Sequence, residues 1–307
     1  MSTEAPSAAN QAGTGEKVAG APAPRKVKPA TKGGDRARKI SVYVGITAII
    51  IYCLAPFYWM IVTSLRKSSE VFEKSLIPKP PSMENYAAVF DPVNNFARAL
   101  LNSIIVAGVT TIAVLIIGIF AAYALARLEF RGKSLALSAI IAVSMFPGIA
   151  LVVPLLKIFT DIGWINTYQA LILPSMSFAL PLSVWNLTAF FRQMPQELEQ
   201  AAMVDGCTPW QAFRKIIIPL AAPGVFTTAI IAFVAAWNEF IIALTMTNKS
   251  DYFTAVVAIS QFQGKTGRDI PVGSQMAAGV ILTIPLIIMV LAFQRRIVSG
   301  LTAGGVK

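Results

Sequence analysis

Six separate apolar blocks dominate this sequence and limit what it can fold into. They cover approximately 40–65, 102–126, 134–156, 168–191, 224–246 and 274–294. Each block is close to the length that an α-helix needs to cross about 30 Å of hydrocarbon. Because 55% of the residues are hydrophobic and only 13% are charged, a soluble domain could not bury the apolar surface. The sequence predicts an all-α membrane protein with six transmembrane helices.

Several of these blocks contain proline, including Pro147 in the third block and Pro285 in the sixth. An internal proline removes a helical hydrogen bond, which is costly in a soluble helix. Packed membrane helices tolerate the resulting kinks because neighbouring groups satisfy the freed carbonyls. We therefore expect each block to remain one span.

The first 38 residues differ in composition from the rest of the chain. They contain no aromatic residue, so they cannot bury enough surface to offset their ordering entropy, and we expect a disordered tail over 1–38. Basic residues crowd its end, against the single acid Asp35: Arg25, Lys26, Lys28, Lys32, Arg36, Arg38 and Lys39. Such a run beside a span favours the cytoplasmic side. The remainder, 39–307, would then hold the spans, with both chain termini and the segment 192–223 in the cytoplasm.

Residue content excludes several classes of function. The chain has no histidine, which removes histidine-based triads, proton relays and His-ligated zinc sites. Cys53 and Cys207 provide no disulfide framework or metal-binding spacing. Gly264-Lys265-Thr266 lacks the earlier glycine of a phosphate loop, so no nucleotide site is predicted. We expect no catalytic residue, metal site or nucleic-acid surface in this chain.

The segment 192–223 predicts a helical elbow. Pro195 suits the first turn of a helix, and Glu197 and Glu199 favour its positive N-terminal end. Gly206 can adopt the left-handed conformation that stops that helix. Thr208 is then a good N-cap for a second helix, and Gln211 would complete a capping box.

The second helix of the elbow has an apolar face, made by Trp210, Phe213 and Ile217 at helical spacing. Pro219 marks its expected end. A plain connector between spans is one interpretation. The segment is nevertheless long, doubly capped and amphipathic, which favours an element that docks into a groove of another protein.

At these residues the sequence resembles the signature loop of binding-protein-dependent ABC importer permeases: Glu-Ala-Ala, two residues, Asp-Gly, and a spacer ending in an apolar-Pro pair. The stretch 201–206, Ala-Ala-Met-Val-Asp-Gly, and Ile218-Pro219 match. Gln200 stands where the family has glutamate, and Glu199 lies one place earlier. The resemblance covers about 40–307 and is similar to the carbohydrate branch (maltose and trehalose type). It rests also on Asn102-Ser103, on 121–124 with Arg127, on Trp237-Asn238-Glu239 and on 300–307.

The resemblance implies a type I ABC importer permease fold in the bacterial cytoplasmic membrane. It implies four kinds of partner: a second permease, two cytoplasmic ATPase subunits that bind ATP and Mg²⁺, an extracytoplasmic solute-binding protein, and lipid. Coupling to the ATPase would use Glu197, Glu199, Ala201, Ala202, Asp205, Gly206, Trp210, Phe213 and Arg214. A second ATPase contact would use Thr302, Gly304 and Gly305.

Glu239 is the one acid placed well inside a predicted span, flanked by Trp237 and Asn238. A carboxylate in a membrane is costly unless paired, so this trio is the candidate substrate pathway. Pairing of Glu239 with a neighbouring helix is the alternative. For Asn186 we favour a helix–helix hydrogen bond.

The sequence therefore predicts a permease subunit, and no enzyme, of an ATP-driven sugar importer for a disaccharide or oligosaccharide such as maltose or trehalose. A polyol or glycerol-phosphate-type solute is the alternative. An ion-coupled secondary transporter fits less well, since such proteins usually carry several intramembrane ionisable groups.

Overall fold

The computed structural model describes residues 32–263 and 271–303, with side chains over 38–263 and 271–293. The chain divides into two units, Met1–Leu54 and Ala55–Lys307, and each is described by itself. All regular elements in the described ranges are helical, as predicted. The helices are α1 (Lys32–Ser64), α2 (Glu84–Val89), α3 (Phe96–Arg127), α4 (Lys133–Ser144), α5 (Ile149–Asp161), α6 (Tyr168–Gln193), α7 (Glu197–Val204), α8 (Pro209–Ala212), α9 (Ile218–Trp237), α10 (Ile241–Met246), α11 (Ala255–Ser260) and α12 (Val272–Ala303). Turns of 3₁₀-helix cover Ser68–Glu70, Pro92–Asn94 and Ser250–Tyr252, and Phe213–Ile217 forms a π-helical turn.

Five described helical segments are long and apolar enough to cross a membrane, judged by length and composition. They are Arg38–Ser64, Pro92–Arg127, Tyr168–Gln193, Pro209–Trp237 and Val272–Phe293. The pair α4 and α5 passes the same test only when taken together, and would make a sixth span. The two termini are not placed on either side of a membrane by this geometry, so their orientation remains a prediction.

The third apolar block is not one continuous helix, which corrects the expectation for 134–156. Helix α4 ends at Ser144, α5 begins at Ile149, and the two are bent by 89°. Pro147 lies in the break. Proline has no N–H to donate and disfavours helical geometry at the residue before it, so the sequence 145–148 separates two helices.

The predicted tail is shorter than expected at its C-terminal end. Helix α1 begins at Lys32, so 32–38 is helical, whereas 1–31 lies outside the described residues. Arg and Lys are good helix formers, and extending an existing helix avoids a new nucleation step. The basic end of the tail therefore continues the first span.

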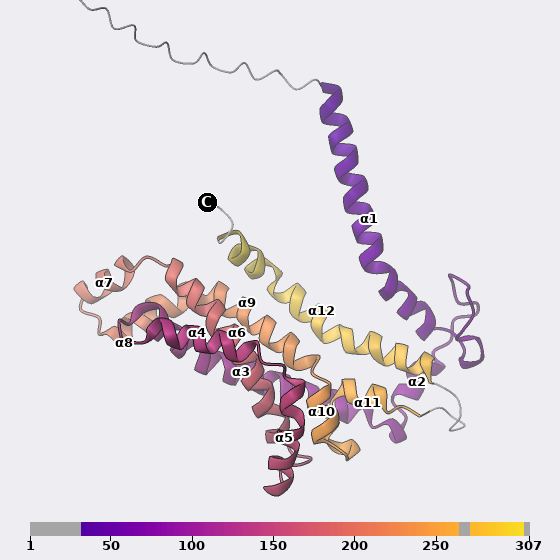
Figure 1. Ribbon diagram of the computed structural model, residues 1–307. Helices are drawn as coiled ribbons and strands as arrows, with labels where there is room; N and C mark the ends of the chain where they lie inside the picture. The colour runs from indigo at the N-terminus through magenta and orange to yellow at the C-terminus, as the bar shows by residue number, and fades with distance from the viewer. Residues whose placement is uncertain (1–31, 264–270, 304–307) are drawn as a thin grey trace, which may run out of the picture. The chain divides into compact units, whose positions relative to one another are not determined.

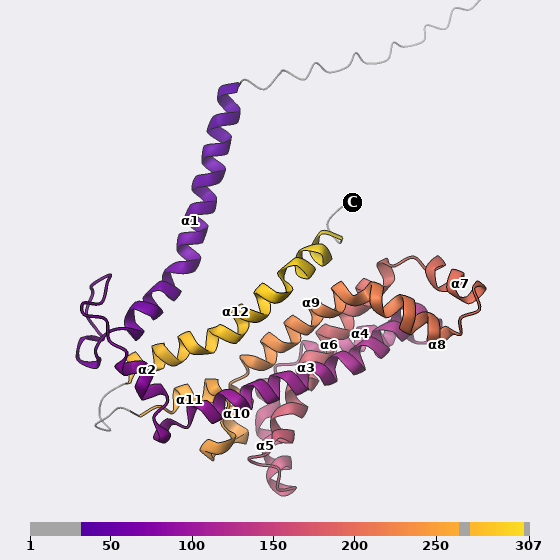
Figure 2. The ribbon, with the colours of Figure 1, turned by 180° about the vertical axis from the view of Figure 1, so that it is seen from behind.

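Helices α3, α6 and α9 lie side by side and form the core of the second unit (Figures 1 and 2). In both views α7 and α8 lie at one end of this bundle, and α10 and α11 lie at the other end. Small buried residues line the helix contacts, including Ala107, Ala122 and Ala232. Small side chains let membrane helices approach closely, and their van der Waals contacts then drive association.

Asn102 ties α3 to the segment that precedes α11. Its amide donates to the carbonyls of Asp251 (2.8 Å) and Phe253 (2.9 Å), and its oxygen accepts from the hydroxyl of Tyr168 at 2.8 Å. The hydroxyl of Ser103 accepts from the first N–H of α11 at 2.8 Å. The Asn102-Ser103 pair therefore satisfies loop backbone groups that would otherwise be buried without a partner.

The loop after α1 folds around a buried arginine. Arg66, 2% exposed, donates from its guanidinium to the carbonyls of Val71, Glu73 and Ser75. The guanidinium also lies 4.9 Å from the centre of the Trp59 ring. In the fold Arg66 shapes that loop, because a guanidinium presents several donors in fixed geometry.

Candidate coupling loop and translocation pathway

The elbow predicted over 192–223 is present, with the predicted caps. Helix α7 ends ahead of Gly206, whose φ of +85° lies in the left-handed region. Helix α8 then begins with a complete capping box. The Gln211 N–H donates to the Thr208 hydroxyl at 3.3 Å, and the Thr208 N–H donates to the Gln211 side chain at 2.8 Å. Local residue chemistry thus builds the turn between the two helices.

Pro219 does not end the second helix, which corrects the expectation from sequence. From Pro209 the chain stays helical to Trp237, through α8, the π-helical turn and α9. In the π-helical turn the N–H of Ile218 bonds the carbonyl of Phe213. This bond spans five residues where an α-helix spans four, and it lies directly before Pro219. Pro219 therefore occupies the first turn of α9, where the missing N–H of a proline is tolerated. The second arm of the elbow is therefore continuous with a span.

The residues predicted to contact an ATPase fall into two groups. An exposed group could meet a partner: Glu197, Ala201, Asp205, Gly206, Trp210 and Arg214. An inward group packs within the chain: Glu199, Ala202 and Phe213. Glu199 and Ala202 lie three residues apart, so they share the face of α7 that packs on the protein, and the opposite face of α7 is exposed.

The inward group is held by an aromatic cluster. The Phe213 ring, in a residue only 5% exposed, lies 4.6 Å from Tyr123, 5.8 Å from Phe120 and 5.4 Å from Trp210 (ring centres). Trp210 also stacks on Phe120, with centres 6.2 Å apart and planes inclined by 17°. Trp210 remains 57% exposed. The predicted apolar face of the second helix therefore packs mainly on α3. One side of the Trp210 ring stacks on Phe120, and the rest of the ring is exposed to solvent.

An ion pair that sequence reasoning did not find connects α7 to α3. Glu199 Oε1 lies 2.8 Å from Arg127 Nε, and Glu199 Oε2 accepts from the Tyr123 hydroxyl at 3.1 Å. Arg127 also donates from Nη2 to the carbonyl of Met194 at 2.9 Å. The sequence did hold one indication that Glu199 faces inward. Glu199 lies three residues before Ala202, which is buried, so the two residues share one face of α7.

The three candidate pathway residues point in different directions. Trp237 is 1% exposed, and its ring stacks on Phe233 at 5.4 Å in a cluster that includes Ala107. Asn238 is exposed and donates to the carbonyl of Val234 at 2.9 Å. Trp237 therefore packs in the helix bundle, and its side chain is not available at a surface.

Glu239 lies in the break between α9 and α10 and caps the latter helix. Its two carboxylate oxygens accept from the N–H groups of Ile242 (2.8 Å) and Ala243 (2.9 Å). These N–H groups belong to the first turn of α10, where they lack helical partners and favour a negative charge. Backbone N–H groups of the following short helix thus satisfy this carboxylate.

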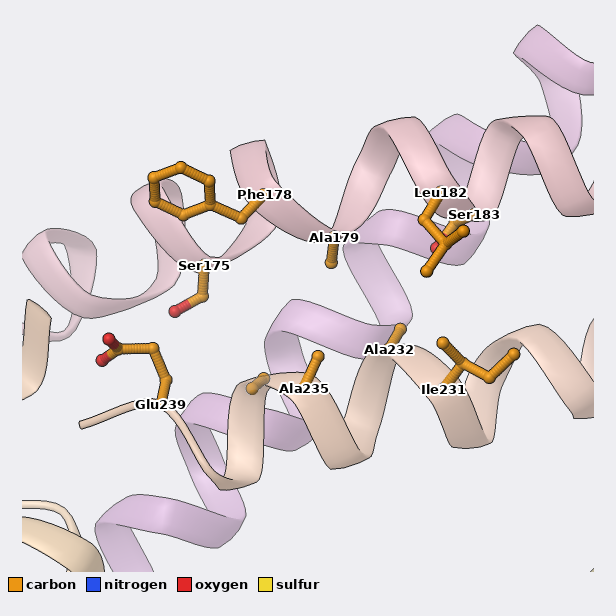
Figure 3. A pocket seen from close by; sticks show the side chains of 10 residues that line it. Ser175, Phe178, Ala179, Leu182, Ser183, Ile231, Ala232, Ala235 and Glu239 are labelled. Atoms are coloured by element: carbon orange, nitrogen blue, oxygen red, sulfur yellow. The ribbon is translucent and has the colours of Figure 1, made fainter. Parts of the chain in front are cut away.

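Glu239 also lines a pocket between α6 and α9 (Figure 3). In the close-up its carboxylate and the hydroxyl of Ser175 lie at one end of the pocket, and Ser183 lies toward the other end. The cavity measures about 110 Å³ and is otherwise mostly apolar. It could hold several water molecules but is smaller than the ~300–1,000 Å³ of typical small-molecule sites.

Other expectations can also be placed. Asn186 on α6 donates to the Thr228 hydroxyl on α9 at 2.7 Å, which confirms the predicted helix–helix bond. Thr302 lies in the last turn of α12. Gly304, Gly305 and the segment 264–266 lie outside the described residues.

Comparisons with known proteins agree with this geometry. Residues 94–302 match the family described as binding-protein-dependent transport system inner membrane component. The chain is 46% identical to the trehalose transport system permease protein SugB of Mycobacterium tuberculosis, over 88% of this chain and 99% of that protein. It is 45% identical to the trehalose/maltose transport system permease protein MalG of Thermococcus litoralis, over 88% and 97%. A third relative, the sulfoquinovosyl glycerol transport system permease protein SmoH of Agrobacterium fabrum, is 41% identical over 86% and 93%.

A solved structure shares the fold. It is a chain of a bacterial ABC transporter involved in the import of the acidic polysaccharide alginate, with a TM-score of 0.71, 20% identity, and coverage of 87% of this chain and 99% of that one. With a family match over two thirds of its length and relatives aligned almost end to end, this chain belongs to the binding-protein-dependent transport system inner membrane component family and is a multi-pass permease subunit of an ABC transporter.

Proposed function

We propose that this chain is a permease subunit of an ATP-driven importer for a neutral disaccharide of the trehalose or maltose type. The observation that carries the proposal is the identity of 45–46% to trehalose and trehalose/maltose permeases over 88% of the chain. The proposed partners are a second permease, two ATPase subunits on the cytoplasmic side and a solute-binding protein on the other side.

The elbow supports the coupling part of this proposal. Helix α7 projects exposed residues from the end of the bundle, and its second arm runs without interruption into the span α9. A docked partner that moved α7 and α8 would therefore move a transmembrane helix directly. ATP and Mg²⁺ bound in the partner subunits would supply the free energy. The permease can change state only if its partner interacts differently with the inward- and outward-facing forms.

The pocket between α6 and α9 is smaller than a typical small-molecule site, but it contains Glu239 of the candidate pathway, and its described lining offers no basic group to an anionic solute. Its lining contains the hydroxyls of Ser175 and Ser183 and the carboxylate of Glu239, and no lysine or arginine is among its described residues. A sulfonate or carboxylate ligand would gain most from charge-assisted bonds to a basic side chain. The SmoH relative keeps sulfoquinovosyl glycerol as the second candidate.

The proposal is tested by purifying the complex through a tag on this chain and reconstituting it in proteoliposomes with its binding protein. ATP hydrolysis and solute uptake are measured with trehalose, maltose and sulfoquinovosyl glycerol, with the binding protein omitted as control. We expect the binding protein to stimulate hydrolysis and uptake with trehalose or maltose. Stimulation by sulfoquinovosyl glycerol alone would select the second candidate, and stimulation by none of the three would reject the proposal.

A further inference from the structure

Helix α7 is fastened to the end of α3 by a single carboxylate with a partner on each oxygen. Arg127 Nε lies 2.8 Å from Glu199 Oε1, and the Tyr123 hydroxyl donates to Oε2 at 3.1 Å. The side chains of Arg127 and Glu199 are only 5% and 15% exposed. Exposed ion pairs contribute little because water screens them, whereas this pair is shielded. The contact of Arg127 Nε with Glu199 Oε1 is an ion pair without hydrogen-bond alignment, and the directional bonds are those from the Tyr123 hydroxyl to Glu199 and from Arg127 Nη2 to Met194.

The same arginine also holds the chain that leads into α7. Its Nη2 donates at 2.9 Å to the carbonyl of Met194, three residues before the helix begins. Arg127 therefore grips α7 both through the side chain of Glu199 and through the preceding backbone. A planar guanidinium can make both contacts at once, which a lysine ammonium does less well.

Packing around Tyr123 fixes the third member of the network. Its ring lies 6.0 Å from Phe191 at the end of α6 and 4.6 Å from Phe213 in the π-helical turn. The tyrosine hydroxyl is therefore presented to Glu199 from a ring that cannot easily turn away, since close-packed interiors leave little free volume.

The network matters because α7 is joined to its neighbours by turns at both ends and not by continuous helix. Residues 194–196 precede it, and the turn at Gly206 follows it. Without a tie, a displacement of α7 could be absorbed by these turns. The tie directs the displacement into α3, which packs along both α6 and α9.

We propose that Arg127 and Tyr123 are positioning residues that clamp Glu199 to α3, so that movement of α7 is delivered to the α3–α6–α9 bundle. This inference rests on the proposed function, in which α7 docks on the ATPase. It assigns to Glu199 an internal role in place of the direct ATPase contact expected from sequence. It also names α3 as the helix that receives the motion, alongside α9, to which the elbow is covalently continuous.

The test uses the reconstituted complex and measures solute imported per ATP hydrolysed. Glu199→Gln and Arg127→Met each remove one charge of the clamp, and Tyr123→Phe removes only the hydroxyl. The matched control is Glu129→Gln, which breaks the ion pair of Glu129, whose side chain is 89% exposed, with Lys133 (3.1 Å) near the same end of α3. Thermal stability and subunit assembly are measured for every variant.

We expect Glu199→Gln and Arg127→Met to lower the import-to-hydrolysis ratio about tenfold, within the range of typical coupling free energies. Tyr123→Phe should have a smaller effect, and Glu129→Gln should leave the ratio unchanged. The exchanged pair Arg127→Glu with Glu199→Arg should recover part of the ratio, because the ion pair is restored with its charges reversed.

The proposal is overturned if Glu199→Gln and Arg127→Met retain the ratio of the unaltered complex. It is equally overturned if uptake falls only in proportion to the amount of assembled complex, since the residues would then serve folding alone. Failure of the proposed function is distinguishable, because it would appear as absence of ATP-driven import in the unaltered complex.

Discussion

Asn186 on α6 donates a hydrogen bond of 2.7 Å from its side-chain amide to the Thr228 hydroxyl on α9, so that the bond joins two transmembrane segments. The Thr228 hydroxyl itself donates to the carbonyl of Gly224 at 2.9 Å. The bond thus joins two helices through a group that is already oriented by its own backbone. It gives α6 and α9 a fixed register next to the Ser183 and Ile231 end of the pocket.

Removing this bond should weaken the helix pair without abolishing it. Asn186→Leu is expected to cost about 1 kcal/mol, because interhelical hydrogen bonds in membranes contribute modestly. Thermal unfolding of the purified complex measures the loss. Ser177→Ala is the matched control on the same helix, since its exposed hydroxyl donates only to its own helix, at Leu173. A variant with unchanged melting temperature would contradict the importance of the bond.

Gly224 on α9 lies directly against the ring of Phe190 on α6. A Cβ at this position would lie 2.5–2.8 Å from ring atoms of Phe190. Gly224→Ala should therefore destabilise the protein by about 1–3 kcal/mol through overpacking. Gly108→Ala is the control, since its Cβ would meet nothing within 4 Å. Adding Phe190→Leu should recover part of the loss in melting temperature, and no recovery would mean that another contact is responsible.

Gly206 is required for its backbone conformation. A Cβ there would touch nothing within 4 Å, but φ is +85°. Gly206→Val should strain the turn by at least about 1–2 kcal/mol and lower transport, whereas Gly206→Asn should largely retain it, because asparagine tolerates the left-handed region. Uptake in proteoliposomes and membrane insertion are measured together. If Gly206→Asn lowers uptake as much as Gly206→Val, the loss is caused by the added side chain meeting a partner surface and not by backbone strain.

Asp205 is exposed at the tip of the elbow, directly after α7. If this tip docks on the ATPase, Asp205→Lys should abolish transport while membrane insertion is retained, because the reversed charge enters the interface. Asp161→Lys is a matched control, since Asp161 is an exposed acid at the end of α5. Persistent transport in Asp205→Lys would show that the docking assignment is wrong.

Glu239 offers a way to separate a capping role from solute recognition. Glu239→Ala removes both bonds to the N–H groups of Ile242 and Ala243 and should cost about 0.5–2 kcal/mol, as for other lost caps. Glu239→Gln keeps an acceptor and should retain most of the melting temperature. If Glu239 serves only as a cap, we expect the KM for uptake to change only in a variant whose melting temperature also falls. A raised KM in Glu239→Gln at full stability would instead indicate contact with the solute.

Sequence alone determined the class of the protein and the position of the helical elbow. Long apolar blocks have few solutions other than spanning helices, because every backbone group in lipid must be satisfied internally. Capping is a similarly local rule, so Thr208, Gln211 and Gly206 lie in the turn as predicted. The bond of Asn186 was predicted in kind, since a lone amide in a span needs a polar partner on a neighbouring helix.

Tertiary structure decided what depends on residues far apart in the chain. Pro147 separates two helices, while Pro219 is carried through a continuous helix by the π-helical turn before it, and local propensity treats both prolines alike. Glu199 faces inward only because Arg127 and Tyr123, more than 70 residues earlier, lie against α7 (the Tyr123–Glu199 separation is 76 residues). Trp237 and Glu239 are two residues apart in sequence, yet Trp237 faces the bundle core and Glu239 faces the pocket between α6 and α9. Periodicity gives the face of one helix, but the partner that covers that face is fixed only when the helices pack.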